Sequence, residues 1–275
     1  DIGGLSGWPE SDLIMMERTL GEYINDEQFF TYYMTVSGHH PYSFADSSVA
    51  KKNQALVEHL QMSEECKAYI ACIIELDRAL EHLITELDKA GKLETTVFCL
   101  STDHYPYGLT DAQHQELLGH KYYYDGLESH KQALIIWNSA METVKVDKPC
   151  CTIDVLPTLL NLFGFDYDSR LYSGRDILSD CEGIAITSNQ SLILADSVYN
   201  SRYGFTYEYY HRTGKKVTDD RYDRYIAEVK NRFAMASAIL NYNFYSYLDA
   251  EVIAKAQDWE QRPPVLPPQK VQSAE

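Results

Sequence analysis

Apolar residues recur at helical spacing in several stretches of the chain. Leu13, Met16, Leu20 and Ile24 repeat at intervals of three or four residues, which predicts a helix over residues 10–26. Similar patterns, two of them closed by a glycine that can end a helix, predict three further helices at residues 64–91, 152–163 and 218–240.

Aromatic and β-branched runs between these helices predict strands. The longest run covers residues 29–36 and stops at Ser37-Gly38, so we expect a buried strand there. Shorter runs predict strands at 95–100, 132–137, 184–187, 192–195 and 205–210. Strands that alternate with helices in this way indicate an α/β fold.

The pattern of predicted helices and strands changes near residue 183. Residues 1–182 carry the longer α/β pattern and are expected to form the main region. Residues 183–261 combine short strands, polar turns and one helix, which is typical of a smaller α+β subdomain. The segment 262–275 holds four prolines and is predicted to be a linker or a tail.

The chain is acidic, with 41 Asp and Glu against 24 Lys and Arg and a net charge of −17. A polyanion is repelled by this charge, so we expect no nucleic acid partner. None of the six cysteines forms a CxxC pair, which argues against a zinc ribbon. The sequence has neither a run of about 18 apolar residues nor a signal peptide. Because it starts at Asp1, we expect it to be cut from a longer protein.

An Asp-His pair follows the predicted strand at 95–100. Asp103 offers a hard oxygen and His104 a neutral nitrogen, which together suit a divalent metal ion. Neighbouring residues of a strand point to opposite faces, so the two can share one ion only where the chain turns. The Tyr-Pro-Tyr-Gly sequence at 105–108 supplies such a turn, and Asp103 and His104 are the predicted metal ligands.

Two histidines follow the longest predicted strand in the equivalent position. Ligands bind at the carboxyl ends of strands in open α/β sheets, so His39 and His40 are expected at the same rim. An imidazole there can bind the ion, hold a phosphate oxygen or protonate a leaving alkoxide; alternatively it caps the turn through its ring N–H. His130 and Lys131, which precede the strand at 132–137, are either substrate-binding residues of this rim or a solvated strand entrance.

Five segments of the chain resemble, in order, the motifs of the lipoteichoic acid synthases, which belong to the alkaline phosphatase and sulfatase superfamily. They are TVSGHHPY at 35–42, the stretch from DRAL to TDH at 77–104, HKQALIIW at 130–137, IDVLPTLLNLFG at 153–164 and SGRDIL at 173–178. Residues 183–245 are more loosely similar to the closing subdomain of that family.

The resemblance implies a sulfatase-like α/β fold with a central mixed sheet flanked by helices. Residues 1–182 would then be the catalytic region and 183–261 the C-terminal subdomain. In the family, a threonine nucleophile and a further acidic ligand precede the segment matched at 35–42, and residues 1–30 offer no convincing candidate for the nucleophile. We therefore expect that the N-terminal part of the domain is missing and that this chain is inactive alone.

The resemblance also implies roles for site residues. Asp103 and His104 would bind a divalent metal ion, with Mn²⁺ favoured over Zn²⁺ or Mg²⁺, and His39 would be the catalytic residue that holds the substrate phosphate. The implied function is transfer of a phosphoglycerol-type group from a lipid donor to a polyol or glycan acceptor in cell-envelope polymer synthesis. It would take place on the extracytoplasmic face of a bacterial cell membrane, reached through a missing N-terminal anchor. A sulfatase or phosphodiesterase acting on a similar anionic ester, and a non-catalytic scaffold, are the alternatives.

Overall fold

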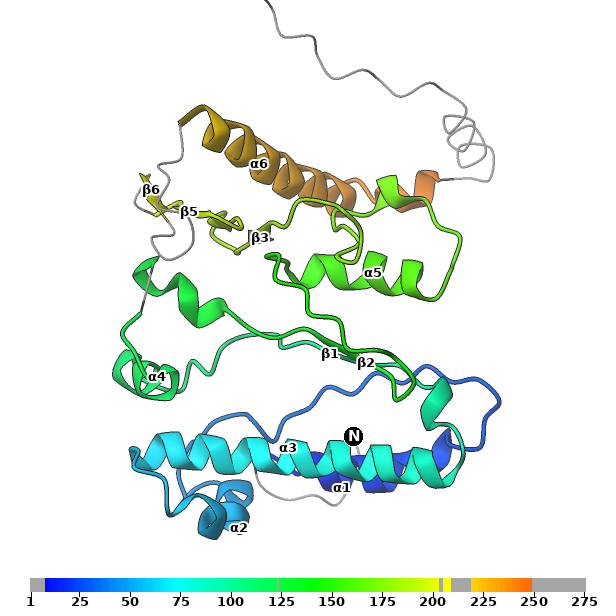
Figure 1. Ribbon diagram of the computed structural model, residues 1–275, viewed down its shortest axis with the longest axis vertical. Coiled ribbons are helices and arrows are strands. Elements are labelled where there is room, and N and C mark those ends of the chain that lie inside the picture. The colour runs from blue at the N-terminus through cyan, green and yellow to red at the C-terminus, as the bar shows by residue number, and fades with distance from the viewer. Residues whose placement is uncertain (1–7, 123, 203–204, 209–218, 249–275) are drawn as a thin grey trace, which may run out of the picture. The chain divides into compact units, whose positions relative to one another are not determined.

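The computed structural model describes residues 8–122, 124–202, 205–208 and 219–248 (Figure 1). The chain divides into two compact units, Asp1–Val144 and Lys145–Glu275. The boundary expected between residues 182 and 183 falls inside the second unit, and the functional division drawn there stays a prediction. The proline-rich segment 262–275 lies outside the described residues.

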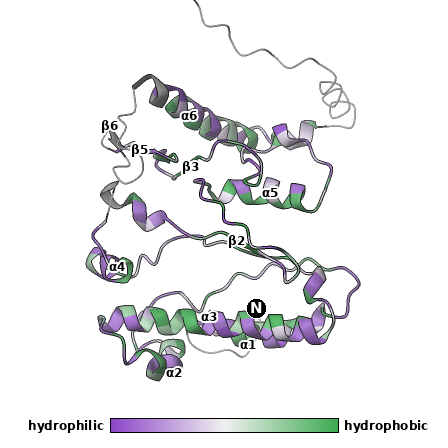
Figure 2. Cartoon of the chain, in the orientation of Figure 1, coloured by the Kyte–Doolittle hydropathy of each residue, from purple (hydrophilic) through white to green (hydrophobic). Residues whose placement is uncertain are grey.

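The long helix α3 (Glu64–Lys89) organises the first unit. Helix α1 (Asp12–Thr19), continued by a 3₁₀ turn at Leu20–Glu22, and helix α2 (Ser48–Val57) both pack against it. Figure 2 shows hydrophobic and hydrophilic residues interspersed along α3, as expected of an amphipathic helix. The buried side chains form two clusters: Tyr42, Val49, Ala50, Val57, Ala68, Ala71, Cys72 and Leu109 near α2, and Met16, Leu20, Ala79 and Leu83 near α1.

Two short strands form the sheet of the first unit. Strand β1 (Phe98–Leu100) pairs antiparallel with β2 (Ile135–Trp137). Phe98 packs against the cluster near α1, and the Asn138 side chain donates a hydrogen bond to the Thr96 carbonyl at 2.8 Å. The strands predicted at 95–100 and 132–137 are therefore confirmed in place, but each is shorter than predicted and covers only the last three residues of its range.

The buried strand predicted at 29–36 is wrong. No strand of the described residues pairs with this segment. Three alternate side chains lie in solvent: Phe30 is 91% exposed, Tyr32 77% and Met34 71%. Tyr33, between them, packs instead against the cluster near α1. A strand requires a hydrogen-bonded neighbour as well as suitable side chains, and the described part of the chain supplies none.

An antiparallel sheet and one long helix build most of the second unit. Its four strands pair in chain order: β3 (Ala185–Ile186), β4 (Leu192–Ile193), β5 (Ser197–Asn200) and β6 (Phe205–Glu208). Helix α6 (Asp219–Asn241) packs against this sheet through a core made of Ile184, Leu192, Leu194, Tyr225 and Val229. Helix α5 (Val155–Leu162) follows a 3₁₀ turn at Thr152–Asp154 and is followed by Gly164, whose φ of 68° is left-handed.

The observed elements confirm an α/β fold. The described strands form a two-stranded and a four-stranded antiparallel sheet rather than the central mixed sheet that the resemblance implied. The sequence pattern does not predict α2 or the short helix α4 (Asp111–Leu118), which begins at a capping box formed by Thr110 and Gln113. Other 3₁₀ turns lie at Leu93–Thr95, Tyr124–His130, Ser169–Leu171 and Phe244–Tyr247. None of the described helices has the length and apolar character needed to cross a lipid bilayer.

Candidate active site

The loop after residues 29–36 and the loop after β1 meet at one place in the first unit. The ring centroids of His39 and His104 lie 6.3 Å apart with the rings almost perpendicular, at 87°. Tyr107 contacts both rings, with centroid distances of 4.8 Å to His104 and 6.1 Å to His39. We call His39, His40, His104 and Tyr107 the imidazole cluster. The structure thus brings His39 and His104 together, while their chemical roles stay predictions.

The Asp-His pair lies in a bend after β1 that brings the two side chains together. His104 Nε2 lies 3.5 Å from Asp103 Oδ2, and His104 Nδ1 lies 2.8 Å from the Tyr105 carbonyl oxygen. Because a carbonyl only accepts, we assign the ring proton of a neutral imidazole to Nδ1, which leaves a lone pair on Nε2. This lone pair and the carboxylate oxygen face each other, an arrangement that a cation between them stabilises. A carbonyl behind the ring is also the usual support of a metal-binding histidine.

These two residues supply only part of a metal site. The side chain of Asp103 is 85% exposed and that of His104 is 42% exposed, so both are open to solvent. Within the residues that the structure describes, no group of three or more His, Cys, Asp or Glu side chains is arranged to hold a metal ion. A protein-bound divalent ion takes four or more ligands. The donors therefore fit such an ion, but as two members of a larger set.

His39 makes a hydrogen bond at each ring nitrogen. Nδ1 lies 3.1 Å from the His40 carbonyl oxygen, so Nδ1 donates and Nε2 of the neutral ring accepts. The Tyr107 hydroxyl lies 3.2 Å from Nε2 and donates to it. The Trp8 ring packs edge-on against His39 with centroids 4.9 Å apart. Nε2 is therefore the atom through which His39, in its protonated form, can donate a hydrogen bond to a substrate oxygen.

The turn after the Asp-His pair packs closely on His40. A Cβ atom on Gly108 would come within 2.9 Å of His40 Cβ, so the close approach requires glycine. The His114 Nε2 atom lies 2.9 Å from the Pro106 carbonyl oxygen and holds the turn from another side. The His40 and Tyr107 rings lie 5.7 Å apart. His40 is thus in contact with the turn that positions Tyr107.

His130 and Lys131 lie further along the same region. The His130 ring packs perpendicular to the Tyr105 ring at 5.0 Å, and Tyr105 is the neighbour of His104. Burial lowers the pKa of His130. Lys131 is exposed. The structure therefore connects His130 to the imidazole cluster through Tyr105.

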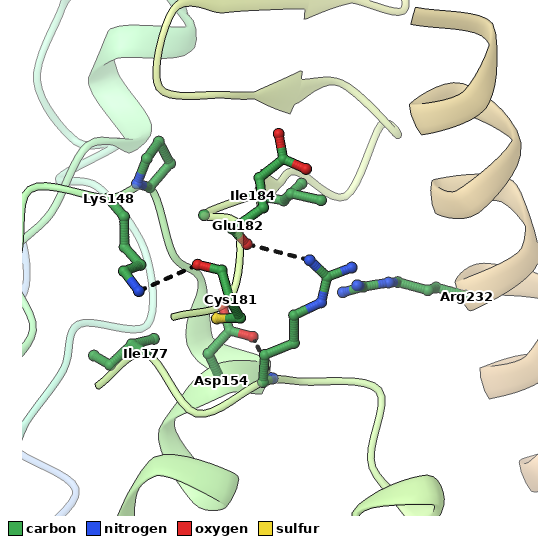
Figure 3. A pocket seen from close by; sticks show the side chains of 10 residues that line it. Lys148, Asp154, Ile177, Cys181, Glu182, Ile184 and Arg232 are labelled. Atoms are coloured by element: carbon green, nitrogen blue, oxygen red, sulfur yellow. Dashed lines mark hydrogen bonds between the residues drawn. The ribbon is translucent and has the colours of Figure 1, made fainter. Parts of the chain in front are cut away.

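A small cavity in the second unit is lined by charged groups that are already paired (Figure 3). The Lys148 ammonium donates to the Cys181 carbonyl at 3.2 Å. Arg175 and Arg232 both form ion pairs with Glu228. The cavity measures about 10 Å³, which leaves room for about one water molecule. It is a structural junction of the segment at 173–178 rather than a ligand site.

The family model described as sulfatase matches this chain over residues 5–165. The match takes in more than half of the chain, including both loops of the imidazole cluster. The chain belongs to the sulfatase family. This family generally uses a divalent metal ion, which agrees with the donor atoms that Asp103 and His104 present.

Individual relatives of this sulfatase-family chain are lipoteichoic acid synthase-like. The lipoteichoic acid synthase-like protein YvgJ of Bacillus subtilis is 25% identical over 250 residues, which cover 87% of this chain and 39% of YvgJ. Lipoteichoic acid synthase 2 of the same organism is 25% identical over 225 residues, or 78% of this chain and 32% of the relative. The chain therefore spans about two fifths or less of the length of these relatives.

A solved structure supports the fold. The crystal structure of the lipoteichoic acid synthase LtaP from Listeria monocytogenes matches with a TM-score of 0.69 at 17% identity, covering 88% of this chain and 62% of that chain. The sulfatase-like fold implied by the motifs is thereby confirmed.

Two aromatic residues of the site were not singled out from the sequence. Tyr107 lies in the Tyr-Pro-Tyr-Gly turn after His104, and its hydroxyl could have been noticed as a polar group next to the predicted metal ligands. Trp8 lies far from His39 in the sequence, and no local pattern indicates that the two rings touch.

Proposed function

We propose that this chain is part of a metal-dependent transferase that moves a phosphoglycerol-type group from a lipid donor to a polyol or glycan acceptor in cell-envelope synthesis. The observation that carries this proposal is that His39 lies close to His104 of the Asp103–His104 pair, although the two histidines belong to different loops. The names of the relatives point to lipoteichoic acid synthesis in a bacterium, and the transferred group and the membrane setting are those that the family resemblance implies. Because the chain spans only part of those relatives, the whole activity is proposed for the longer protein.

The metal is held in this proposal by Asp103 Oδ2 and His104 Nε2, with Mn²⁺ as the ion. When bound, a divalent ion neutralises charge on the oxygens of a phosphoryl group. The Tyr105 carbonyl keeps His104 in the tautomer that presents Nε2. The remaining ligands and the threonine nucleophile implied by the family resemblance would come from outside the described residues.

The substrate phosphate is held in this proposal by His39. Its Nε2 atom accepts a hydrogen bond from the Tyr107 hydroxyl at 3.2 Å in the neutral ring, so this atom faces a position that an oxygen can occupy. Once protonated, the same nitrogen can donate to a phosphate oxygen or to a leaving alkoxide. His40, His130 and Lys131 are proposed to add positive charge or donors around the anionic lipid-linked substrate.

A hydrolase of the same family is the second candidate. The high exposure of Asp103, at 85%, lets water reach the site, whereas a transferase must exclude water from its phosphoryl group. The two candidates differ in the final acceptor of the transferred group. Incubating the longer protein with a glycerophosphate lipid and, separately, with a sulfate ester distinguishes them: polymer formation supports the transferase, and release of free glycerol phosphate or sulfate supports the hydrolase.

The metal assignment has its own test on the 275-residue chain. We expect weak Mn²⁺ binding, measured by electron paramagnetic resonance, because two ligands hold an ion loosely. Asp103→Ala should abolish it, whereas Asp77→Ala, an exposed carboxylate on α3, should leave it unchanged. Equal Mn²⁺ binding by the wild type and Asp103→Ala would contradict the assignment.

A further inference from the structure

The beginning of α1 is tied by hydrogen bonds to the loop that carries His39. Asp12 Oδ1 accepts from the Val36 N–H at 2.8 Å, and Asp12 Oδ2 accepts from the Ser37 N–H at 3.0 Å. In return, the Ser37 hydroxyl accepts from the Asp12 N–H at 2.8 Å and donates to the Glu10 carbonyl at 3.1 Å. Four hydrogen bonds thus join two segments that are far apart in the sequence.

Both side chains of this contact are fully buried, with Asp12 and Ser37 at 0% exposure. A buried carboxylate is unfavourable unless its oxygens are paired, and here each oxygen has a backbone donor. Burial nevertheless raises the pKa of Asp12, against the hydrogen bonds from Val36 and Ser37, which lower it. The two backbone hydrogen bonds therefore offset part of the cost of burying Asp12 and fix the orientation of its carboxylate.

The turn between Ser37 and His39 is held from its other side as well. The His39 N–H donates to the Val36 carbonyl at 3.0 Å, which closes the turn. The Tyr42 hydroxyl donates to the Gly38 carbonyl at 3.0 Å. With the Asp12 contact at one end and the Tyr42 contact at the other, the backbone of His39 has little freedom to move.

We propose that Asp12 is the positioning residue of His39: its carboxylate fixes the 36–38 backbone so that His39 Nε2 stays directed toward the Tyr107 hydroxyl. Asp12 touches neither the cluster nor a substrate atom, and it acts through the Val36 and Ser37 amides. This inference rests on the proposed role of His39 as the phosphate-holding residue. It is independent of the metal ligands, because Asp103 and His104 belong to a different loop.

The chain offers a matched control for this proposal. Asp154, in the second unit, is also a buried carboxylate that accepts two backbone N–H groups, from Cys151 at 2.9 Å and from Arg175 at 2.8 Å. Asp12→Asn and Asp154→Asn therefore remove the same charge from the same kind of environment. Each replacement turns an amide NH₂ group toward one backbone donor, but only the first change lies next to the His39 loop.

The experiment follows the imidazole signals of the 275-residue chain by nuclear magnetic resonance while inorganic phosphate is added. The His39 signals are identified by their loss in His39→Gln. In the wild type, phosphate should shift the His39 signals. Asp12→Asn should move the His39 signals of the free chain and weaken phosphate binding by about tenfold, or about 1.4 kcal/mol. Asp154→Asn should leave both unchanged.

The possible outcomes separate the two ideas. Wild-type His39 signals that ignore phosphate, but that move in Asp12→Asn, would reject the phosphate role and keep the positioning role. His39 signals and phosphate affinity that are unchanged in Asp12→Asn would reject the positioning role, and so would signals of His114 that move as much as those of His39. If Asp12→Asn loses its helical circular dichroism, Ser37→Ala replaces it. This variant removes the hydroxyl that accepts from the Asp12 N–H and donates to the Glu10 carbonyl. It should shift the His39 signals and weaken phosphate binding in the same direction, but by less.

Discussion

Replacing Glu75 with glutamine is expected to destabilise the first unit strongly. Glu75 is completely buried in α3, and its carboxylate accepts hydrogen bonds from Lys52 at 2.8 Å, from Asn53 at 3.2 Å and from the Ser11 hydroxyl. Burial alone would raise the pKa of Glu75, but the hydrogen bonds from these three donors outweigh it and lower the pKa. A single carboxylate therefore joins the start of α1 to α2 and α3.

Glutamine cannot satisfy the same three donors. Its oxygen can face Lys52 and Ser11, but its NH₂ group then meets the NH₂ group of Asn53. Asn53 cannot turn over, because its amide donates to the Ala71 carbonyl and accepts from Arg78. A hydrogen bond to a charged group contributes about 1.5–3 kcal/mol, and a buried unpaired donor costs about 1–3 kcal/mol. Lys52 is 46% exposed and keeps part of its hydration, so we expect a total loss of about 2–3 kcal/mol.

Urea denaturation followed by helical circular dichroism measures this change. With an m-value of about 2 kcal/mol/M, the midpoint should fall by about 1–1.5 M in Glu75→Gln while the slope stays constant. Glu86→Gln is the matched control on the same helix, because Glu86 pairs with Lys89 at 2.7 Å on the surface. It should leave the midpoint where it is. Equal midpoints for Glu75→Gln and the wild type would refute the idea that this buried carboxylate holds the three helices together.

Three further changes test other parts of the structure. The folded-state pKa of Glu75 is held below its ordinary value of 4.5, so the ionised carboxylate stabilises the fold above that pH, and this stabilisation is lost as the pH falls through the folded-state pKa. The urea midpoints of the wild type and Glu75→Gln should therefore converge below about pH 4.5. A difference between the two midpoints that stays constant with pH would contradict this linkage. Gly108→Ala places a Cβ atom 2.9 Å from His40 Cβ and should reduce the unfolding free energy by about 1–3 kcal/mol and shift the His40 imidazole signals, whereas an unchanged spectrum would show that the turn is not tightly packed. Phe30→Ser and Tyr32→Ser should each change the stability of this chain by less than about 0.5 kcal/mol; a loss of several times that size would mean that the segment is buried in solution.

Local sequence patterns were sufficient to predict the helices α1, α3, α5 and α6 and the chemistry of single turns. The apolar repeat of α3 and the glycine after it predict that helix almost to its ends, because both signals lie within the helix itself. The Asp103-His104 pair was recognisable as a candidate because an oxygen donor and a nitrogen donor are adjacent and a turn follows them directly. Family motifs then gave the sulfatase-like fold, which the match over residues 5–165 confirms.

Elements that depend on contacts with residues far away in the sequence could not be predicted from local patterns. Residues 29–36 have the composition of a buried strand, but strand pairing requires a neighbour that a one-dimensional pattern does not contain. The short helix α2 packs on α3, and it was missed because the polar Asn53 lies in the middle of its buried face, between Ala50 and Val57, and interrupts the apolar repeat.

The residues that could carry the chemistry are recognisable from short segments of sequence, since donor atoms, helix periodicity and turn-forming residues are local properties. Which of these residues meet depends on the tertiary structure. It brought His39 to His104, placed the Tyr107 hydroxyl on His39 Nε2, and buried Asp12 beneath the His39 loop. These contacts join residues far apart in the chain, and they form only when the packing of α1 and α3 brings their loops together.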